Sequence, residues 1–169
     1  MRELPGQPGD LAGAVGFHAP AIRTELADPA GADAQRLIDA LSAALRLLTG
    51  DDGRSRAPLE DLRPPTGRFV IARDPRGHAV GCGGLRVLDT VRGQIKRMYA
   101  VPGSGAGAAV LRRLEDEARA LGLARVLLST RRVNQRAVSF YRRHGYHDAA
   151  AFGAYAGRAE SVCLQKELA

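Results

Sequence analysis

The residues whose type and spacing most clearly suggest a chemical role are three glycines within five positions. They are Gly103, Gly105 and Gly107, in the segment PGSGAGAA. Glycine lacks a Cβ atom, so the backbone N–H groups of such a turn can point together at one anion. Apolar residues at helical spacing follow as far as residue 121, and the start of that helix would add free N–H groups and a positive dipole end. The pattern predicts a cradle for a pyrophosphate. An ordinary turn before a helix is an equally good interpretation of the glycines alone.

The surroundings of the turn exclude two familiar nucleotide sites. A P-loop needs Lys followed by Ser or Thr directly after its glycines, and no such pair follows here. A Rossmann site needs a strand–helix–strand unit with an acidic residue about 20 residues beyond the glycines. Hairpin-like segments precede the turn instead, and the next strand does not end in such an acidic residue.

The segments that must position this turn have the patterns of strands and helices. Strands are expected at 20–26, 68–73, 78–88, 94–101, 125–130, 146–150 and 161–166. Apolar residues at spacings of three and four predict helices at 33–48, from the glycine turn to 121, where Gly122 ends the helix, and from Asn134 to Gly145. The segment 50–65 is polar and rich in turn residues, with one helical turn expected at 59–62.

Three of these strands follow one another through the short turn sequences DPRG and DTVRG, which predicts an antiparallel run from 68 to 101. Glycines at positions 81, 83 and 84 predict a bulge or a close approach of another backbone. The strand 125–130 follows a strand and a helix, so a crossover would place it parallel to 94–101.

The chain length of 169 residues suits one domain with a real core, which we place at 17–169. Residues 1–16 are rich in Gly and Pro and predict a flexible N-terminal tail without a secretory signal. No stretch approaches the roughly 20 apolar residues of a membrane span. The two cysteines, Cys82 and Cys163, fit no metal spacing and are expected to be buried strand residues. We therefore expect a cytoplasmic protein without a metal.

The formal net charge of +7 favours an anionic partner, a class that includes nucleic acid, a membrane surface and a phosphorylated cofactor. An arginine-rich composition without functional meaning explains the charge equally well. Aromatic residues make up only 5% of the chain, and no stretch interleaves them with basic residues as a platform for single-stranded nucleic acid would. We expect no membrane partner and regard nucleic acid as an unfavoured one.

Several linked segments resemble the GNAT superfamily of acyl-coenzyme-A-dependent N-acyltransferases. IKRMY, the glycine-rich turn and the helix VLRRLEDEARALG are similar to the central motif of the family. RVLLST follows, and NQRAVSFYRRHGY resembles the family segment N-x-x-A-x-x-x-Y-x-x-x-G-[FY]. The hairpin GRFVIARDPRGHAVGCGGLR and the last strand SVCLQKEL fit a bacterial branch. The resemblance implies the GNAT fold, an α+β arrangement with a mixed, mostly antiparallel central sheet and helices on both faces.

The resemblance also implies where acetyl-coenzyme A would bind. Its pantetheine arm would pair with the splayed end of a strand, and its pyrophosphate would lie on the glycine-rich turn. Asn134 matches a position that hydrogen-bonds the amide groups of the cofactor, and it also fits a plain helix N-cap. The implied cofactor-binding residues are Met98, Tyr99, Ala100, Val101, Gly103, Ser104, Gly105, Ala106, Gly107, Ala108, Asn134 and Tyr141.

The implied reaction is direct acyl transfer from acetyl-coenzyme A to a primary amine of a small molecule. A backbone N–H near Met98 or Tyr99 would stabilise the tetrahedral oxyanion. Tyr141 matches the family tyrosine that protonates the departing thiolate, and a phenol of pKa about 10 suits this role in a desolvated site. Plain packing on the helix face is the alternative role for Tyr141. Family members often pair through late strands, so a homodimer is a further expectation.

Several positions depart from the family pattern near the chemistry. Gln94 stands where the branch often has Glu, a candidate general base, and Ser129 replaces a further acidic position in the next strand. We keep Gln94 as a candidate catalytic and substrate-binding position and Ser129 as a substrate-binding one. The phosphate loop is short, with Pro102 where Arg or Gln is usual. A water relay, His144, His147 or an acceptor amine of low pKa could make up for a lost base.

Three functions are therefore open. An active N-acetyltransferase on an unidentified small amine is favoured by the ordered motifs and by Tyr141. The alternative is a catalytically impaired protein of the GNAT fold that binds acyl-coenzyme A, or another ligand, in a sensor or regulatory role. A basic binding module for a macromolecule has only the net charge in its support.

Overall fold

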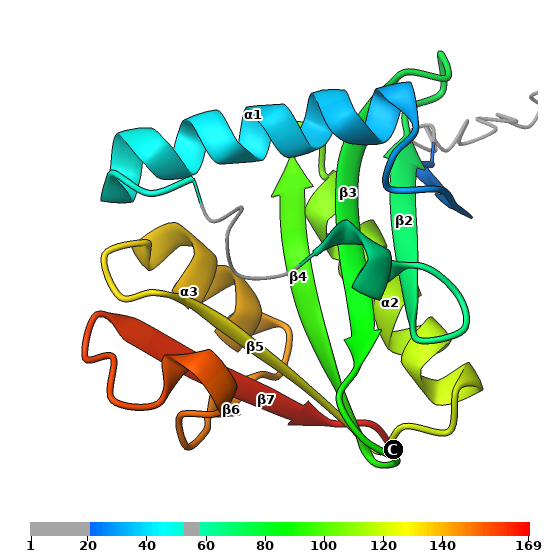
Figure 1. The fold of residues 1–169 in the computed structure, drawn as a ribbon. Helices are drawn as coiled ribbons and strands as arrows, with labels where there is room; N and C mark the ends of the chain where they lie inside the picture. Colours follow the sequence, from blue (N-terminus) through cyan, green and yellow to red (C-terminus); the bar gives the residue numbers. More distant parts are fainter. Residues whose placement is uncertain (1–20, 53–57) are drawn as a thin grey trace, which may run out of the picture.

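The computed structural model describes residues 21–52 and 58–169, and the predicted tail at 1–16 lies outside these ranges. Its centre is a seven-stranded sheet in the order β1-β2-β3-β4-β5-β7-β6. The strands are β1 (Arg23–Leu26), β2 (Gly67–Arg73), β3 (Ala79–Val87), β4 (Arg92–Ala100), β5 (Arg125–Arg131), β6 (His147–Asp148) and β7 (Ser161–Glu167). Neighbouring strands are antiparallel except β4 and β5, which are parallel (Figure 1). Both the predicted antiparallel run and the predicted parallel crossover are confirmed.

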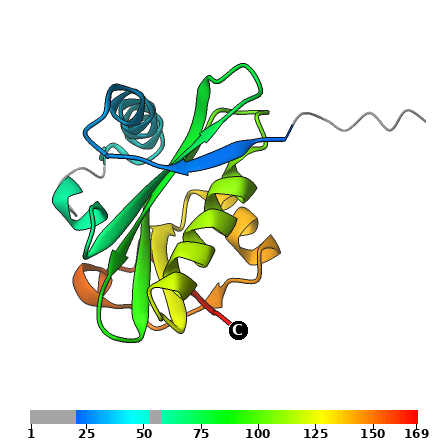
Figure 2. The same ribbon diagram turned by 90° about the vertical axis from the view of Figure 1, so that its right-hand side faces the viewer.

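Helices cover both faces of this sheet, as expected. They are α1 (Ala32–Thr49), α2 (Ala106–Ala120) and α3 (Gln135–Arg143), and short 3-10 turns occur at η2 (Leu59–Leu62) and η3 (Gly153–Tyr155). α1 lies on one face of the sheet, whereas α2 and α3 lie on the other (Figures 1 and 2). The arrangement is a mixed α+β fold.

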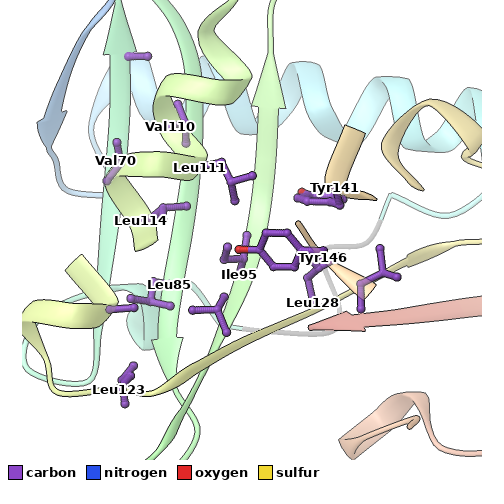
Figure 3. Close-up of a cluster of buried hydrophobic side chains, with 14 of the residues drawn as sticks. Val70, Leu85, Ile95, Val110, Leu111, Leu114, Leu123, Leu128, Tyr141 and Tyr146 are labelled. Atoms are coloured by element: carbon purple, nitrogen blue, oxygen red, sulfur yellow. The ribbon is translucent and has the colours of Figure 1, made fainter. Parts of the chain in front are cut away.

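The alternation of side chains along β2 divides the interior into two cores. Val70 and Ala72 belong to the core under α2, whereas Phe69 and Ile71 belong to the core under α1 and η2. Successive residues of a strand point to opposite faces, so one buried strand serves both layers. The core under α2 extends to the aromatic residues of the C-terminal half (Figure 3).

Helix α2 follows from its pattern and from the glycine that ends it. Its apolar side is almost completely buried, at 0–1% exposure for Val110, Leu111, Leu114 and Ala118. Each fully buried leucine contributes about 1.5–3 kcal/mol relative to an exposed one. Gly122 adopts a φ of 78°, and its N–H donates to the carbonyl of Arg119 at 2.9 Å. The helix therefore ends at a glycine in the left-handed conformation, as predicted.

A bulge interrupts the ladder between β3 and β4, which confirms one reading of the glycines at 81, 83 and 84. Cys82 pairs with Tyr99, but Gly84 pairs with Lys96, so β4 has an extra residue in this interval. Arg97 adopts a φ of 57° there. A Cβ atom on Gly83 would lie 2.9 Å from a methyl group of Leu114. The close approach at Gly83 therefore comes from side chains of α2 and β4 rather than from another backbone.

The parallel strands β4 and β5 pair over only part of their length. Their ladder runs from Arg92 opposite Arg125 to Gln94 opposite Leu127. Beyond it, β4 continues along β3, and β5 continues along β7 as far as Arg131. The two strands therefore diverge toward α1, and Figure 1 shows the gap between their C-terminal halves.

Candidate active site

A cavity of about 140 Å³ lies in the gap between β4 and β5. Four elements contribute to its walls: α1, β4, β5 and α3. The lining residues are Leu41, Leu45, Ile95, Lys96, Arg97, Met98, Leu128, Ser129, Thr130, Asn134, Ala137 and Tyr141. Met98, Ser129, Asn134 and Tyr141, which the sequence nominated separately, are thus brought to one place.

A second cavity of about 130 Å³ adjoins the first on the side of η3, and Leu41 and Leu45 of α1 line both. The two share walls from α1, β4 and β5, including Ile95 and Ser129. The second cavity is closed by Arg131, Tyr155 and Ser161, which do not line the first. The opening between the strands therefore connects surroundings from both faces of the sheet.

Tyr141 lies on the buried side of α3 and faces the first cavity. Its ring packs edge-on against Phe140, at 5.2 Å between centroids, and against Tyr146, at 5.6 Å. Its hydroxyl has no hydrogen-bond partner among the residues that the structure describes. Burial raises the pKa of Tyr141 above its ordinary value of 10, so the phenol stays protonated at neutral pH. A buried O–H group beside a cavity can donate a proton or a hydrogen bond to a ligand there (Figure 3).

The glycine turn leads from the open end of β4 into α2. Gly103 and Gly105 have φ angles of 79° and 71°, and a Cβ atom on either would meet nothing within 4 Å. Glycine is therefore required here by backbone conformation rather than by crowding. The hydroxyl of Ser104 accepts from the N–H of Ala106 at 3.2 Å. No side chain caps the helix at Gly105, so the first turn of α2 presents backbone donors to a ligand.

The start of α2 lies close to α3. A Cβ atom on Gly107 would be 3.4 Å from the ring of Phe140 and 3.7 Å from the Cβ of Ala100. Ala108 follows on the same first turn. The predicted anion cradle therefore borders the same helix that carries Tyr141.

One edge of β4 faces the gap beyond the ladder with β5. Met98, Tyr99 and Ala100 lie beyond the β4–β5 ladder, so this edge has no strand partner there among the described residues. The N–H of Val101 instead donates to the carbonyl of Val80 at 2.8 Å, and its side chain is exposed. Val101 thus continues the pairing of β4 with β3 just beyond the last residue of the strand.

Asn134 and Ser129 both line the first cavity. The side chain of Asn134 accepts from the N–H of Ala137 at 3.2 Å, so the N-cap role that the sequence allowed is confirmed. Its amide nitrogen keeps two donor hydrogens for a ligand. Ser129 is half-buried on β5 and lines both cavities.

Gln94 is the nominated residue that the structure does not bring into the site. Its side chain is 1% exposed, and its oxygen accepts from Arg86 Nε at 2.8 Å, while Arg86 forms an ion pair with Asp61 at 3.1 Å. It lines neither cavity, because it is the last residue of β4 that still pairs with β5. The two histidines also lie elsewhere: His144 Nδ1 contacts the carbonyl of Phe140, and His147 is exposed.

The sequence analysis did not nominate four side chains that line the second cavity and could bind a ligand: Lys96, Arg97, Arg131 and Tyr155. Lys96 is two residues beyond Gln94, so the period of a strand could have placed it on the same face. Arg97 lies in the bulge and Tyr155 in a short irregular turn, and neither has a sequence signal of this kind.

Two other features bear on the type of site. Within 21–52 and 58–169, no group of three or more His, Cys, Asp or Glu side chains could hold a metal ion. No helix in these ranges is long and apolar enough to cross a membrane.

A wider depression of about 480 Å³ lies near β6 and β7, lined by Arg132, Arg142 and Arg158 among others, and it contains none of the nominated residues.

A parallel strand pair that diverges around a cavity, followed by a glycine turn and a helix start, is the arrangement that the resemblance to acyl-coenzyme-A-dependent acyltransferases implies. The model of the Acetyltransferase (GNAT) family matches residues 35–146, and the chain belongs to this family. A protein called IAA acetyltransferase from Azospirillum brasilense is 36% identical over 138 residues, which cover 79% of this chain and 89% of that protein.

Solved structures agree with this assignment. A candidate acyl-CoA N-acyltransferase from Klebsiella pneumoniae is 30% identical with a TM-score of 0.75, and the match covers 88% of this chain and 98% of that one. A GNAT family acetyltransferase from Elizabethkingia anophelis with acetyl-CoA bound has a TM-score of 0.62 at 16% identity, covering 87% of this chain and 98% of that one. At that identity the likeness shows the fold alone.

Proposed function

We propose that the protein transfers an acetyl group from acetyl-coenzyme A directly to a primary amine. The observation that carries the proposal is the cavity between the diverging strands, because it places a buried tyrosine hydroxyl next to the open edge of β4. The glycine turn that follows this edge gives a binding place for a pyrophosphate. Family membership supports the same reaction class.

Different residues around the gap would bind different parts of acetyl-coenzyme A. Backbone groups of Met98, Tyr99 and Ala100 would hydrogen-bond the pantetheine arm as an added strand would. Backbone N–H groups at the turn and at the start of α2 would hold the pyrophosphate, with the Ser104 hydroxyl ordering that turn. The free N–H₂ of Asn134 would donate to an amide carbonyl of the arm.

The chemistry itself needs two groups on the cofactor side. A backbone N–H of β4 near Met98 or Tyr99 would stabilise the oxyanion that forms when the amine attacks the thioester carbonyl. Tyr141 would give its proton to the departing thiolate, and the raised pKa of the buried phenol keeps that proton available at neutral pH.

The alternative is a GNAT protein that binds acyl-coenzyme A without efficient turnover. It is favoured because the described residues that line the two cavities include no acidic side chain and no histidine. An ammonium with a pKa near 10 must lose a proton before it can attack, and a positioned base contributes about 10²–10⁴-fold to such a step.

Calorimetric titration of the full chain with acetyl-coenzyme A, followed by a thiol-release assay with a broad amine panel, tests the proposal. Saturable one-site binding and release of free coenzyme A that depends on an amine are expected. Binding without any amine-dependent release, at enzyme concentrations high enough to detect slow turnover, would support the binding protein instead. Absence of binding at low and moderate salt would refute both readings of the site.

A further inference from the structure

The second cavity has walls of one charge. Lys96 and Arg97 line it as they line the first cavity, Arg131 lines it alone, and the described residues around it include no Asp or Glu. The remaining lining residues are neutral, namely Leu41, Leu45, Ile95, Ser129, Thr130, Tyr155 and Ser161. A polyamine or another simple cation would be repelled by this arrangement, whereas an anion would be attracted.

The backbone places Lys96 and Arg131 on the same side of the sheet. Ile95 and Leu128 belong to the core under α2, so their strand neighbours Lys96 and Ser129 face α1. Arg131 is two residues beyond Ser129 on β5 and therefore shares its face. The gap between β4 and β5 thus separates two basic edges that face the same space.

Two of the basic side chains have surroundings that suit a bound carboxylate. Lys96 Nζ lies 3.3 Å from the hydroxyl of Tyr155 and 5.8 Å from the centre of its ring. The Nε atom of Arg131 is buried and has no hydrogen-bond partner within the described part of the chain. A buried guanidinium donor without a partner is costly, and a carboxylate can accept from it in two parallel hydrogen bonds.

We infer that the second cavity is the acceptor site, and that the acceptor is a small amino carboxylate whose carboxylate lies against Arg131 and Lys96. This inference rests on the proposed acetyl transfer and deepens it. The amine would then point through the gap toward the first cavity, where the walls at Ile95 and Ser129 are shared.

The same charges bear on the missing base. Nearby positive charges disfavour an ammonium and favour the neutral amine, which is the form that attacks a thioester. A basic cavity would therefore both hold the carboxylate and lower the pKa of the bound amine. This accounts for a site in which Gln94 is turned toward Arg86 and no acidic side chain lines the cavity.

The test compares matched acceptors with the full chain. L-alanine, L-serine, L-leucine and L-glutamate are each assayed against their α-carboxamides, with rates expressed per concentration of neutral amine. Acids are expected to have at least about tenfold higher kcat/KM, because a hydrogen-bonded charge pair is worth at least this much. Equal or better rates with the carboxamides, or transfer confined to polyamines, would overturn the inference and leave acetyl transfer intact.

Variants locate the effect. Arg131→Gln is expected to lower kcat/KM for the acids by about 10- to 100-fold, with little change for the carboxamides and an unchanged KM for acetyl-coenzyme A. Arg131→Lys should restore part of the loss. Arg143→Gln is the matched control, because Arg143 is exposed on α3 and lines neither cavity. An equal loss for acids and carboxamides in Arg131→Gln would contradict the inference.

A direct binding measurement distinguishes failure of the proposed acceptor site from failure of the proposed acetyl transfer. The amino acids and their carboxamides are titrated into the wild-type chain and into Arg131→Gln, each loaded with coenzyme A. Binding of an acid that depends on Arg131 would support the inference even if no transfer were detected. Acetyl-coenzyme A binding without any Arg131-dependent binding of an acid would end it, whereas failure to bind acetyl-coenzyme A refutes the proposed function itself.

Discussion

The two halves of the β4–β5 pair behave as different structures. At the closed half, three residue pairs form a parallel ladder, and Gln94 is buried in a hydrogen bond with Arg86. At the open half, the strands diverge, and the gap holds two cavities next to Tyr141 on one side and Arg131 on the other. Pairing satisfies the backbone and leaves no room for a ligand, whereas loss of pairing exposes both backbone and side chains. The proposed acetyl transfer is therefore assigned to the open half.

The largest effect is expected from removing the phenol at the open half. Tyr141→Phe should lower kcat by about 10²–10⁴-fold, because the departing thiolate loses its proton donor. Steady-state assays and calorimetry check this, with acetyl-coenzyme A affinity changing little. The control is Tyr146→Phe: that tyrosine donates to Glu115 at 3.1 Å and lines neither cavity, so it should cost about 1 kcal/mol of stability and little activity. Similar kcat values in both variants would remove Tyr141 from the mechanism.

The rim of the open half should respond to a change in backbone conformation. Gly105→Ala places a side chain at a φ of 71°, which costs about 1–2 kcal/mol. The turn is expected to shift to relieve this strain and to weaken acetyl-coenzyme A binding roughly tenfold, which corresponds to about 1.4 kcal/mol. Gly157→Ala is the matched control, since its φ is 77° with nothing within 4 Å and it lies far along the chain from the turn. Equal losses of affinity in the two variants would contradict the proposed cradle.

The bulge at which β4 leaves its regular ladder should make stability sensitive to alkali. Burial raises the pKa of the Cys82 thiol to about 12, and its Sγ donates to the carbonyl of Arg97 at 3.4 Å. A folded pKa above the unfolded one gives stability that is complete below about pH 9 and is lost as pH rises toward 12. Denaturant melts should show a loss of about 1.4 kcal/mol from this group between pH 8 and pH 10. Cys82→Ala, compared by slope rather than by absolute stability, should lack this loss, and an unchanged slope would exclude the thiol as its source.

The smallest effect on activity is expected at the closed half. Gln94→Glu restores the acid that the bacterial branch often has, yet the side chain faces Arg86 and lines neither cavity. A general base must be within hydrogen-bond reach of its proton, so we expect less than about a threefold change in kcat. A gain of a hundredfold or more would show that Gln94 communicates with the amine and that the two halves are less distinct than their geometry indicates.

Local sequence patterns predicted most of the helices and strands. They also predicted those parts of the candidate site that lie within a single element. The turn sequences announced the β2–β3–β4 run, and the spacing from Asn134 to Tyr141 placed the tyrosine on the buried side of α3. The gap itself was expected only from the family resemblance. The extent of the gap depends on how far β4 and β5 pair and on a positive φ at Arg97. An arginine in the sequence does not indicate a positive φ. Pairing between distant segments also buries Gln94 in the β4–β5 ladder and brings Lys96 and Arg131 to the same cavity.

The basic second cavity was missed for the same reason. Each of its charged residues is unremarkable in the sequence of a chain with a net charge of +7. Only the arrangement of β4, β5 and η3 gathers Lys96, Arg131 and Tyr155 around one space. Composition therefore indicated an anionic partner without indicating the carboxylate acceptor that we propose beside the cofactor.

The shared walls of the two cavities also have a kinetic consequence. Two molecules that enter the gap from different faces of the sheet can be present together, so neither has to leave before the other arrives. Initial rates measured at several concentrations of both substrates should then give intersecting double-reciprocal lines, the signature of a ternary complex. The divergence of two strands would in this way decide the order of events, with no acetylated side chain needed between them.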